Sequence, residues 1–256
     1  MRTLMNSLLK MILVSSIVAS SPSWSADDNN GPRTGYYRLS TTPMELLGEG
    51  GARTLSEVFA PDEKLRWQLD VPKNYDPVNP PGVIVFINRG TWGGGKKVWN
   101  PVLNDKNLIW IGALDAGDQS PMNERMLKAI LAPTVLAGYY ALDPTRIYVA
   151  GFSGGAHIAN ILSSSKPELF KGGLFMSGAV FWGDKTPAKI DVVRQNRFVF
   201  VAGGNDVARN KVARTAESYR AAGVDNVELM IVPNMRQELP GPSYFEAAID
   251  YLDSRN

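Results

Sequence analysis

From Gly82 to the end of the chain, short runs of β-branched and aromatic residues alternate with longer amphipathic runs. This alternation is typical of βα units on a parallel sheet. Several of the short runs are continuously apolar, as strands covered by helices on both faces are. We therefore predict an α/β fold with a mostly parallel, doubly wound sheet flanked by helices. The expected strands are residues 83–88, 108–114, 146–151, 172–178, 197–203 and 227–233.

The amphipathic runs between these strands have apolar residues at helical spacing. They predict helices over residues 122–140, 154–165, 188–196, 207–223 and 243–256. Pro133 should kink or interrupt the first helix, because proline has no N–H and its ring crowds the preceding turn. Ahead of this core, residues 35–41 and 64–72 are predicted to be antiparallel edge strands, joined by a polar, glycine-rich stretch around 48–51.

The first 25 residues have the pattern of a secretory signal peptide. Arg2 and Lys10 precede an apolar run at 11–19, and small residues follow at Ser23, Ser25 and Ala26. A buried N-terminal helix is the alternative, but the polar stretch that follows favours a cleaved leader. We expect a periplasmic or secreted protein without a stable membrane anchor. Its organisation would be a signal peptide (1–25), an N-terminal extension with an edge strand (26–63) and the α/β domain (64–256).

Charge and composition exclude several classes of partner. Without Arg2 and Lys10, the 27 basic residues become 25, equal to the 25 acidic ones. A neutral chain has no electrostatic reason to bind nucleic acid or an anionic membrane. The chain has no cysteine and one histidine, which argues against disulfides and against a transition-metal site. We expect no cofactor, and composition leaves the oligomeric state open.

The most informative motif is Gly151-Phe152-Ser153-Gly154-Gly155, which lies between a predicted strand and a predicted helix. This is the G-x-S-x-G pattern of a nucleophile elbow in the setting that the motif requires. Glycines let the chain turn tightly and let a substrate approach the serine. The pattern predicts Ser153 as nucleophile and the N–H of Gly154 as an oxyanion donor. A plain glycine-rich turn is the alternative.

The segments DPTRIYVAGFSGGA (143–156), AGGNDVARNKV (202–212) and VPNMRQELPGPSYFEAAIDYL (232–252) resemble the α/β-hydrolase superfamily. Over roughly residues 64–254 the chain looks most like exported bacterial esterases related to poly(3-hydroxybutyrate) depolymerases and feruloyl esterases. The resemblance implies a small-molecule or polymer ester as substrate. It also implies a catalytic triad in the chain order serine, acid, histidine.

Asp206 follows the predicted strand 197–203 and is the candidate for the triad acid. It could also cap the helix that begins after it, and the two roles are compatible. Asp184, which follows the preceding strand, is the reserve candidate.

The triad histidine is missing. Similar proteins read approximately Pro-x-x-Gly-His-Glu-Leu-Pro after the last strand, whereas this chain has Gln237 at the histidine position of the segment 233–240. A glutamine amide cannot accept the proton of Ser153 near neutral pH. Glu238 is an alternative acceptor, and His157, the single histidine, is expected to be a structural residue one helical turn beyond Ser153. The sequence predicts an impaired serine esterase or, alternatively, a non-catalytic pseudo-hydrolase that binds a small ligand or partner.

The glycine-rich segment 86–97 follows the first core strand, where hydrolases of this class place their second oxyanion donor. We expect that donor to be an N–H near Arg89, with Gly90 and Thr91 as candidates. The segment also nearly matches a phosphate-binding P-loop. However, Lys97 stands where Ser or Thr should bind Mg²⁺, and Pro101 should discourage the following helix.

Aromatic residues at expected strand ends and loops could line a substrate pocket near Ser153. The candidates are Trp92, Phe152 and Trp182. Ordinary packing is the alternative role for each of them.

Overall fold

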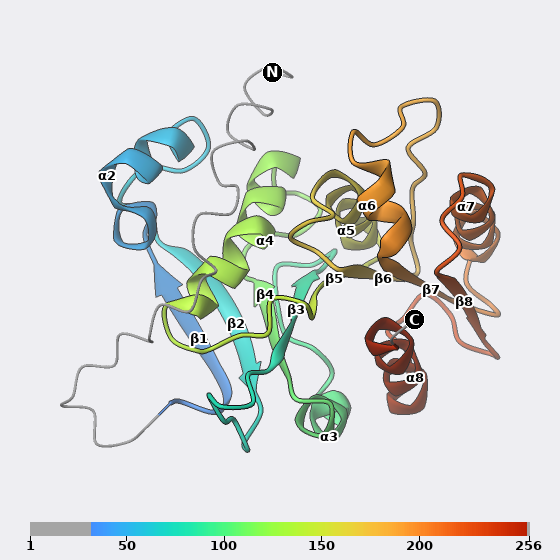
Figure 1. Cartoon of the computed structure of the whole chain (residues 1–256), viewed down its shortest axis with the longest axis horizontal. Helices are drawn as coiled ribbons and strands as arrows, with labels where there is room; N and C mark the ends of the chain where they lie inside the picture. The colour runs from blue at the N-terminus through green and yellow to red at the C-terminus, as the bar shows by residue number, and fades with distance from the viewer. Residues whose placement is uncertain (1–31, 255–256) are drawn as a thin grey trace.

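In the computed structural model, which describes residues 32–254, eight strands form one sheet in the order β1-β2-β4-β3-β5-β6-β7-β8 (Figure 1). The predicted signal segment 1–25 lies outside the described residues. Strands β1 and β2 are antiparallel to their neighbours, and all pairs from β3 onward are parallel. The predicted sheet and its antiparallel edge are therefore confirmed. The strands are β1 (Gly35–Thr41), β2 (Leu65–Val71), β3 (Gly82–Ile87), β4 (Leu108–Ala113), β5 (Ile147–Phe152), β6 (Gly172–Met176), β7 (Arg197–Gly203) and β8 (Val227–Val232).

Helices cover both faces of the sheet. Helices α3 and α8 pack on one face, and α4 to α7 pack on the other, as Figure 1 shows. The helices are α2 (Pro43–Leu55), α3 (Asn100–Asp105), α4 (Met122–Ala137), α5 (Gly154–Ser165), α6 (Ile190–Gln195), α7 (Arg209–Ala221) and α8 (Pro242–Asp253). No helix within residues 32–254 is both long and apolar enough to cross a bilayer.

The continuously apolar strands supply two cores at once. In β3, Val83 and Val85 belong to the core under α4 and α5, whereas Ile84 and Phe86 belong to the core under α3 and α8. Because successive side chains of a strand point to opposite faces, a strand covered on both sides needs apolar residues throughout. This explains why the core strands could be located from the sequence.

The stretch between the first two strands is a helix, α2, where we expected only a polar connection. Thr42 begins it with a capping box: the N–H of Glu45 donates to Thr42 Oγ1 at 3.1 Å, and the N–H of Thr42 donates to Glu45 Oε2 at 2.9 Å. Gly48 has a φ of 65° and kinks the helix. The Thr-x-x-Glu signal was present in the sequence.

Two prolines differ from expectation. Helix α4 continues through Pro133 without interruption, because its flanking residues are buried against the core and their packing outweighs one lost hydrogen bond. Helix α3 begins at Asn100 with Pro101 in its first turn. Proline is tolerated there because the first N–H groups of a helix have no partner inside it. Pro101 therefore starts a short helix instead of preventing one.

Candidate active site

Ser153 occupies a strained turn between the last residue of β5 and the first residue of α5. Its φ is 53° and its ψ is −117°, a conformation that side-chain-bearing residues rarely adopt. Its N–H donates to Met176 O at 2.9 Å, which anchors the turn to the neighbouring strand β6. The side chain is half-buried. This is the local geometry that the G-x-S-x-G pattern predicts.

The glycines of the motif are needed for close backbone packing. A Cβ on Gly151 would lie 2.4 Å from Gly155 O, and a Cβ on Gly155 would lie 2.0 Å from Ile87 O. Both contacts are with backbone, which cannot move aside as a flexible side chain can. The same packing sets the first turn of α5 directly against the end of β3 and the loop that follows it.

Gln237 faces the nucleophile. Its Nε2 donates to Ser153 Oγ at 3.1 Å, and this is the one side-chain hydrogen bond of that hydroxyl within residues 32–254. The glutamine side chain is exposed, so the contact lies at the open edge of the sheet. The position that the resemblance assigns to the triad base is thus beside Ser153, but it holds an amide.

The loop that carries Gln237 is hydrogen-bonded to two other loops. The N–H of Asn205 donates to Met235 O at 2.9 Å, which joins the loops after β7 and β8. On the other side, Lys96 Nζ donates to Leu239 O. The lysine of the P-loop-like segment therefore binds backbone carbonyls of the chain itself.

The glycines of that segment also serve packing. A Cβ on Gly93 would lie 2.1 Å from Gly112 O, and a Cβ on Gly94 would lie 2.1 Å from Gln68 Nε2. The segment is thus pressed against β4 and β2, which accounts for its glycines without a bound phosphate.

Asp206 is buried at 6% exposure just after β7. Its Oδ1 accepts the N–H of Ala208 at 2.8 Å, while Oδ2 is buried without a hydrogen-bond partner in the described part of the chain. The predicted N-cap role is not observed, because α7 begins at Arg209 with Ala208 as its N-cap and has no side-chain capping bond. Asp206 instead closes the turn before α7 and keeps one acceptor atom unused. The reserve candidate, Asp184, is exposed on the loop between β6 and α6.

Neither alternative base, Glu238 or His157, forms a hydrogen bond with Ser153 Oγ within residues 32–254. Glu238 is exposed, and its Oε1 accepts the N–H of Arg236 at 3.4 Å. His157 is half-buried in α5. Burial lowers the pKa of His157, Lys211 lowers it further, and Asp118 opposes the shift.

An ion pair beside the elbow, between the buried Arg125 and the exposed Asp118, was not found from the sequence. Arg125 is 5% exposed, and its guanidinium contacts Asp118 Oδ1 at 3.0 Å and donates to Asn88 O at 2.7 Å. A Cβ on Gly154 would lie 2.2 Å from Asp118 Oδ1, so the carboxylate rests on the turn after Ser153. Burial lowers the pKa of Arg125, and Asp118 opposes this shift. No motif marks these two residues. Asp118 lies on the loop between β4 and α4, and Arg125 in α4 also reaches Asn88 O on the loop after β3.

The loop after β3 supplies unused backbone donors near the elbow. Arg89 O accepts the N–H of Asp118 at 2.7 Å, and Thr91 O accepts the N–H of Asp115 at 2.7 Å. Within residues 32–254, the N–H groups of Gly90 and Thr91 donate to no protein acceptor. Either is free to act as the second oxyanion donor, and this role stays a prediction.

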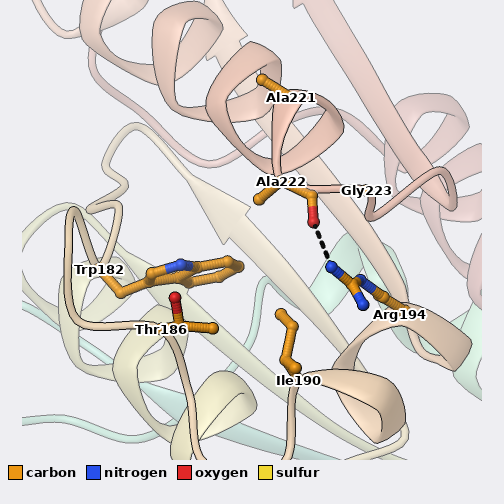
Figure 2. A pocket seen from close by; sticks show the side chains of 7 residues that line it. All are labelled: Trp182, Thr186, Ile190, Arg194, Ala221, Ala222 and Gly223. Carbon is orange, nitrogen blue, oxygen red and sulfur yellow. Dashed lines mark hydrogen bonds between the residues drawn. The ribbon is translucent and has the colours of Figure 1, made fainter.

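The three aromatic pocket candidates are spread over the molecule. Trp92 is 48% exposed on the loop after β3, and Phe152 is half-buried beside Ser153. Trp182 instead packs on Tyr219, with ring centroids 4.5 Å apart. It lines a cavity of about 470 Å³ between the loop after β6, α6 and the end of α7 (Figure 2).

This cavity lies toward the other end of the sheet from Ser153. Arg194, another of its lining residues, lies in the last turn of α6, which leads into the start of β7, whereas Ser153 follows the end of the parallel strand β5. Trp182 is therefore not brought together with the nucleophile. Among residues 32–254, no group of three or more His, Asp or Glu side chains could hold a metal ion.

No family model matches the chain. Two curated plant proteins are similar to part of it. The probable isoprenylcysteine α-carbonyl methylesterase of Oryza sativa subsp. japonica is 30% identical over 113 residues, and its Arabidopsis thaliana counterpart is 32% identical over 113 residues. Each match covers 41% of this chain, and 27% and 26% of the relatives, respectively. The matched part thus spans about a quarter of their length.

Solved structures show the likeness of the whole fold. A substrate-bound, fluorophosphonate-binding serine hydrolase of Staphylococcus aureus matches with a TM-score of 0.62 at 10% identity, covering 88% of this chain and 100% of that one. A thermostable esterase matches with a TM-score of 0.56 at 17% identity, covering 75% of this chain and 59% of that one. With an eight-stranded, mostly parallel sheet and a serine on the turn between β5 and α5, the chain has the α/β-hydrolase fold.

Proposed function

We propose that this chain is an exported, serine-esterase-like protein whose turnover of carboxylic esters through Ser153 is impaired. The observation that carries the proposal is the 3.1 Å hydrogen bond from Gln237 Nε2 to Ser153 Oγ. The fold and its structural neighbours support descent from esterases. The curated relatives, named as methylesterases, are consistent with a small ester as the substrate.

The impairment follows from the first chemical step of ester hydrolysis. Attack by Ser153 Oγ on an ester carbonyl requires that a base accept the hydroxyl proton and later return it to the leaving alcohol. The amide of Gln237 donates to that oxygen and has no basic atom with a pKa near neutrality. Without a base, the site can still bind the substrate and stabilise the oxyanion. These two effects typically give about 10³–10⁴-fold acceleration over the reaction in water.

A non-catalytic pseudo-hydrolase that binds a small ligand is the second candidate function. The unpartnered Oδ2 of Asp206 favours it, because the acid then has no base to orient. The two candidates share the same site and differ in whether slow turnover through Ser153 can be measured.

Hydrolysis of p-nitrophenyl acetate by the purified protein, compared with Ser153→Ala, tests the proposal. We expect a hydrolysis rate far below that of ordinary esterases. The low activity that remains should disappear in Ser153→Ala. If both proteins are equally inert, the pseudo-hydrolase is favoured. Rapid turnover that Ser153→Ala abolishes would refute the impairment. A fluorophosphonate probe gives a second measurement, since it labels a serine only if that serine is activated.

The export part of the proposal rests on the pattern of the first 25 residues. Expression in a bacterium with two membranes, followed by fractionation and N-terminal sequencing of the periplasmic product, tests it. Cleavage near residue 25 is the expected result, and an uncleaved cytoplasmic product would contradict it.

A further inference from the structure

The direction of the hydrogen bond at Ser153 changes what the site can bind. A histidine base accepts the hydroxyl proton of its serine, and the hydroxyl is then committed to that contact. Here Gln237 Nε2 is the donor and Ser153 Oγ is the acceptor. A hydroxyl that accepts one hydrogen bond still has its own proton to donate. The O–H of Ser153 is therefore available to a ligand.

Other donors surround the same point. Gly154 follows Ser153 as the first residue of α5, and the first N–H groups of a helix have no partner inside it. The N–H groups of Gly90 and Thr91, on the loop after β3, also donate to no protein acceptor within residues 32–254. The site thus offers several hydrogen-bond donors, and the nearest carboxylate, that of Asp118 against Gly154, is already paired with Arg125.

Four exposed cationic side chains, Arg89, Arg209, Lys211 and Arg236, lie on segments at this edge of the sheet, and none is in an ion pair within the described part of the chain. We call them the cationic rim. All four lie on segments that follow the carboxyl ends of strands β3, β7 and β8, the same edge of the sheet at which Ser153 stands.

Contacts connect three members of the cationic rim to the elbow. Arg236 precedes Gln237, which contacts Ser153. The backbone of Arg89 binds Asp118, which rests on Gly154. Lys211 acts electrostatically on His157, one turn beyond Ser153.

Negative charge near the site is partly compensated. Asp118 is paired with Arg125 at 3.0 Å, and Asp206 is buried at 6% exposure behind the surface. Glu238 is the exposed carboxylate next to Gln237. Four unpaired cations against this set leave the edge positive, in a chain whose total charge is only +2.

We propose that the Ser153 site binds an organic carboxylate, the acid rather than its ester, through Ser153 O–H and the N–H of Gly154, with the cationic rim holding its charge. Charge-assisted hydrogen bonds are about twice as strong as neutral ones. The inference rests on the proposed function, because a rapidly hydrolysing site would release the acid as product.

Calorimetric titration with hexanoate and with hexanamide tests the ligand class. The two molecules have nearly the same shape and differ in charge, and hexanamide is not an ester that residual activity could consume. We expect hexanoate to bind at least tenfold more tightly at low salt. Its affinity should fall as salt is raised, since exposed charges are screened.

Substitutions locate the binding. Gln237→Glu is nearly isosteric, but it replaces the donor with a negative acceptor, and we expect at least a tenfold loss of hexanoate affinity. Ser153→Ala and Arg236→Gln should each weaken it severalfold. Arg38→Gln is the matched control, because Arg38 is an exposed, unpaired arginine on the edge strand β1. It should leave hexanoate binding unchanged, and circular dichroism should show that all variants fold.

The outcomes separate this inference from the proposed function. Equal binding of hexanoate and hexanamide, or binding of neither, overturns the carboxylate assignment while the impairment of hydrolysis stands. An equal loss of hexanoate affinity in Arg38→Gln and Arg236→Gln would show that the protein attracts the anion through its overall charge and not at this site. That result would also overturn the carboxylate assignment. Rapid hydrolysis of p-nitrophenyl acetate would instead refute the proposed function, whether or not hexanoate binds.

Discussion

The amide nitrogen of Gln237 lies 3.1 Å from the hydroxyl oxygen of Ser153, although 84 positions separate the two residues in the chain. The loops after β7 and β8 create this proximity, since the N–H of Asn205 holds Met235 O at 2.9 Å. The glutamine is therefore in hydrogen-bond contact with the nucleophile, where a base would act on it.

Gln237→His should raise esterase activity. An imidazole at this position would face Ser153 Oγ, and we expect the unpartnered Oδ2 of Asp206 to accept its other N–H. Because general-base catalysis contributes about 10²–10⁴-fold, kcat/KM for p-nitrophenyl acetate should rise by at least about 10²-fold. Asp206→Asn in the Gln237→His background is the control and should remove most of the gain. A folded but inert Gln237→His protein would show that other parts of the site have also changed.

Asp206→Asn in the wild-type background should not destabilise the protein. Asparagine keeps an oxygen to accept the N–H of Ala208, and it replaces the buried negative charge with a neutral amide whose Nδ2 takes the place of the unpartnered Oδ2. A buried charge without a full set of partners costs more than a neutral polar group, so the free energy of unfolding should stay equal or rise by up to about 2 kcal/mol. Urea denaturation measures it, and a clear decrease would mean that Oδ2 has a partner in solution.

Gly155→Ala should destabilise the elbow. The added methyl would lie 2.0 Å from Ile87 O, a backbone atom at the end of β3. Overpacking of this kind costs about 1–3 kcal/mol of unfolding free energy. Gly50→Ala in α2 is the matched control: its Cβ would meet nothing within 4 Å, and we expect a gain of roughly 0.5–1 kcal/mol in thermal or urea unfolding. Equal effects of the two substitutions would contradict the packing argument.

Arg125→Met should be destabilising, because it leaves the buried Asn88 O without its donor and removes the partner of Asp118. A buried acceptor without a partner costs about 1–3 kcal/mol, whereas water can solvate the exposed Asp118 carboxylate. A double-mutant cycle with Asp118→Asn measures the coupling, and the double variant should lose less than the sum of the single losses. Strict additivity would show that the pair does not act as a unit.

The single histidine makes one pH effect directly observable. Burial lowers the pKa of His157 from its ordinary value of 6.5. As pH falls through 6.5, the unfolded chain therefore gains a proton before the folded chain does, and stability decreases. Proton NMR should show one imidazole titrating below 6.5. Relative to His157→Gln, the wild-type protein should lose stability between pH 7 and 5, and an imidazole that titrates above 6.5 would refute this.

The core strands were predictable because each is buried on both faces and must be apolar throughout, as Val83 to Phe86 illustrate. Helix α2 was missed although Thr42 and Glu45 form a recognisable capping box, because two of the glycines inside it, Gly48 and Gly50, suggested a loop. Trp182 was expected near Ser153 from its place after a strand. A long loop carries it to Tyr219 instead, and sequence position alone gives no information on the path of such a loop.

The sequence by itself determined the alternation of strands and helices, the serine on its tight turn and the amide at position 237. These features depend on local steric rules and on periodicity, which neighbouring residues fix among themselves. Only the tertiary structure decided that Arg125 would pair with Asp118 against Gly154, that Lys96 would hold the loop of Gln237, and that Asp206 Oδ2 would be left without a partner. The contact of Asp118 with Gly154 and that of Lys96 with Leu239 O join segments far apart in the chain. Such distances are set by how helices and loops pack on the sheet, and no local rule of the sequence fixes them.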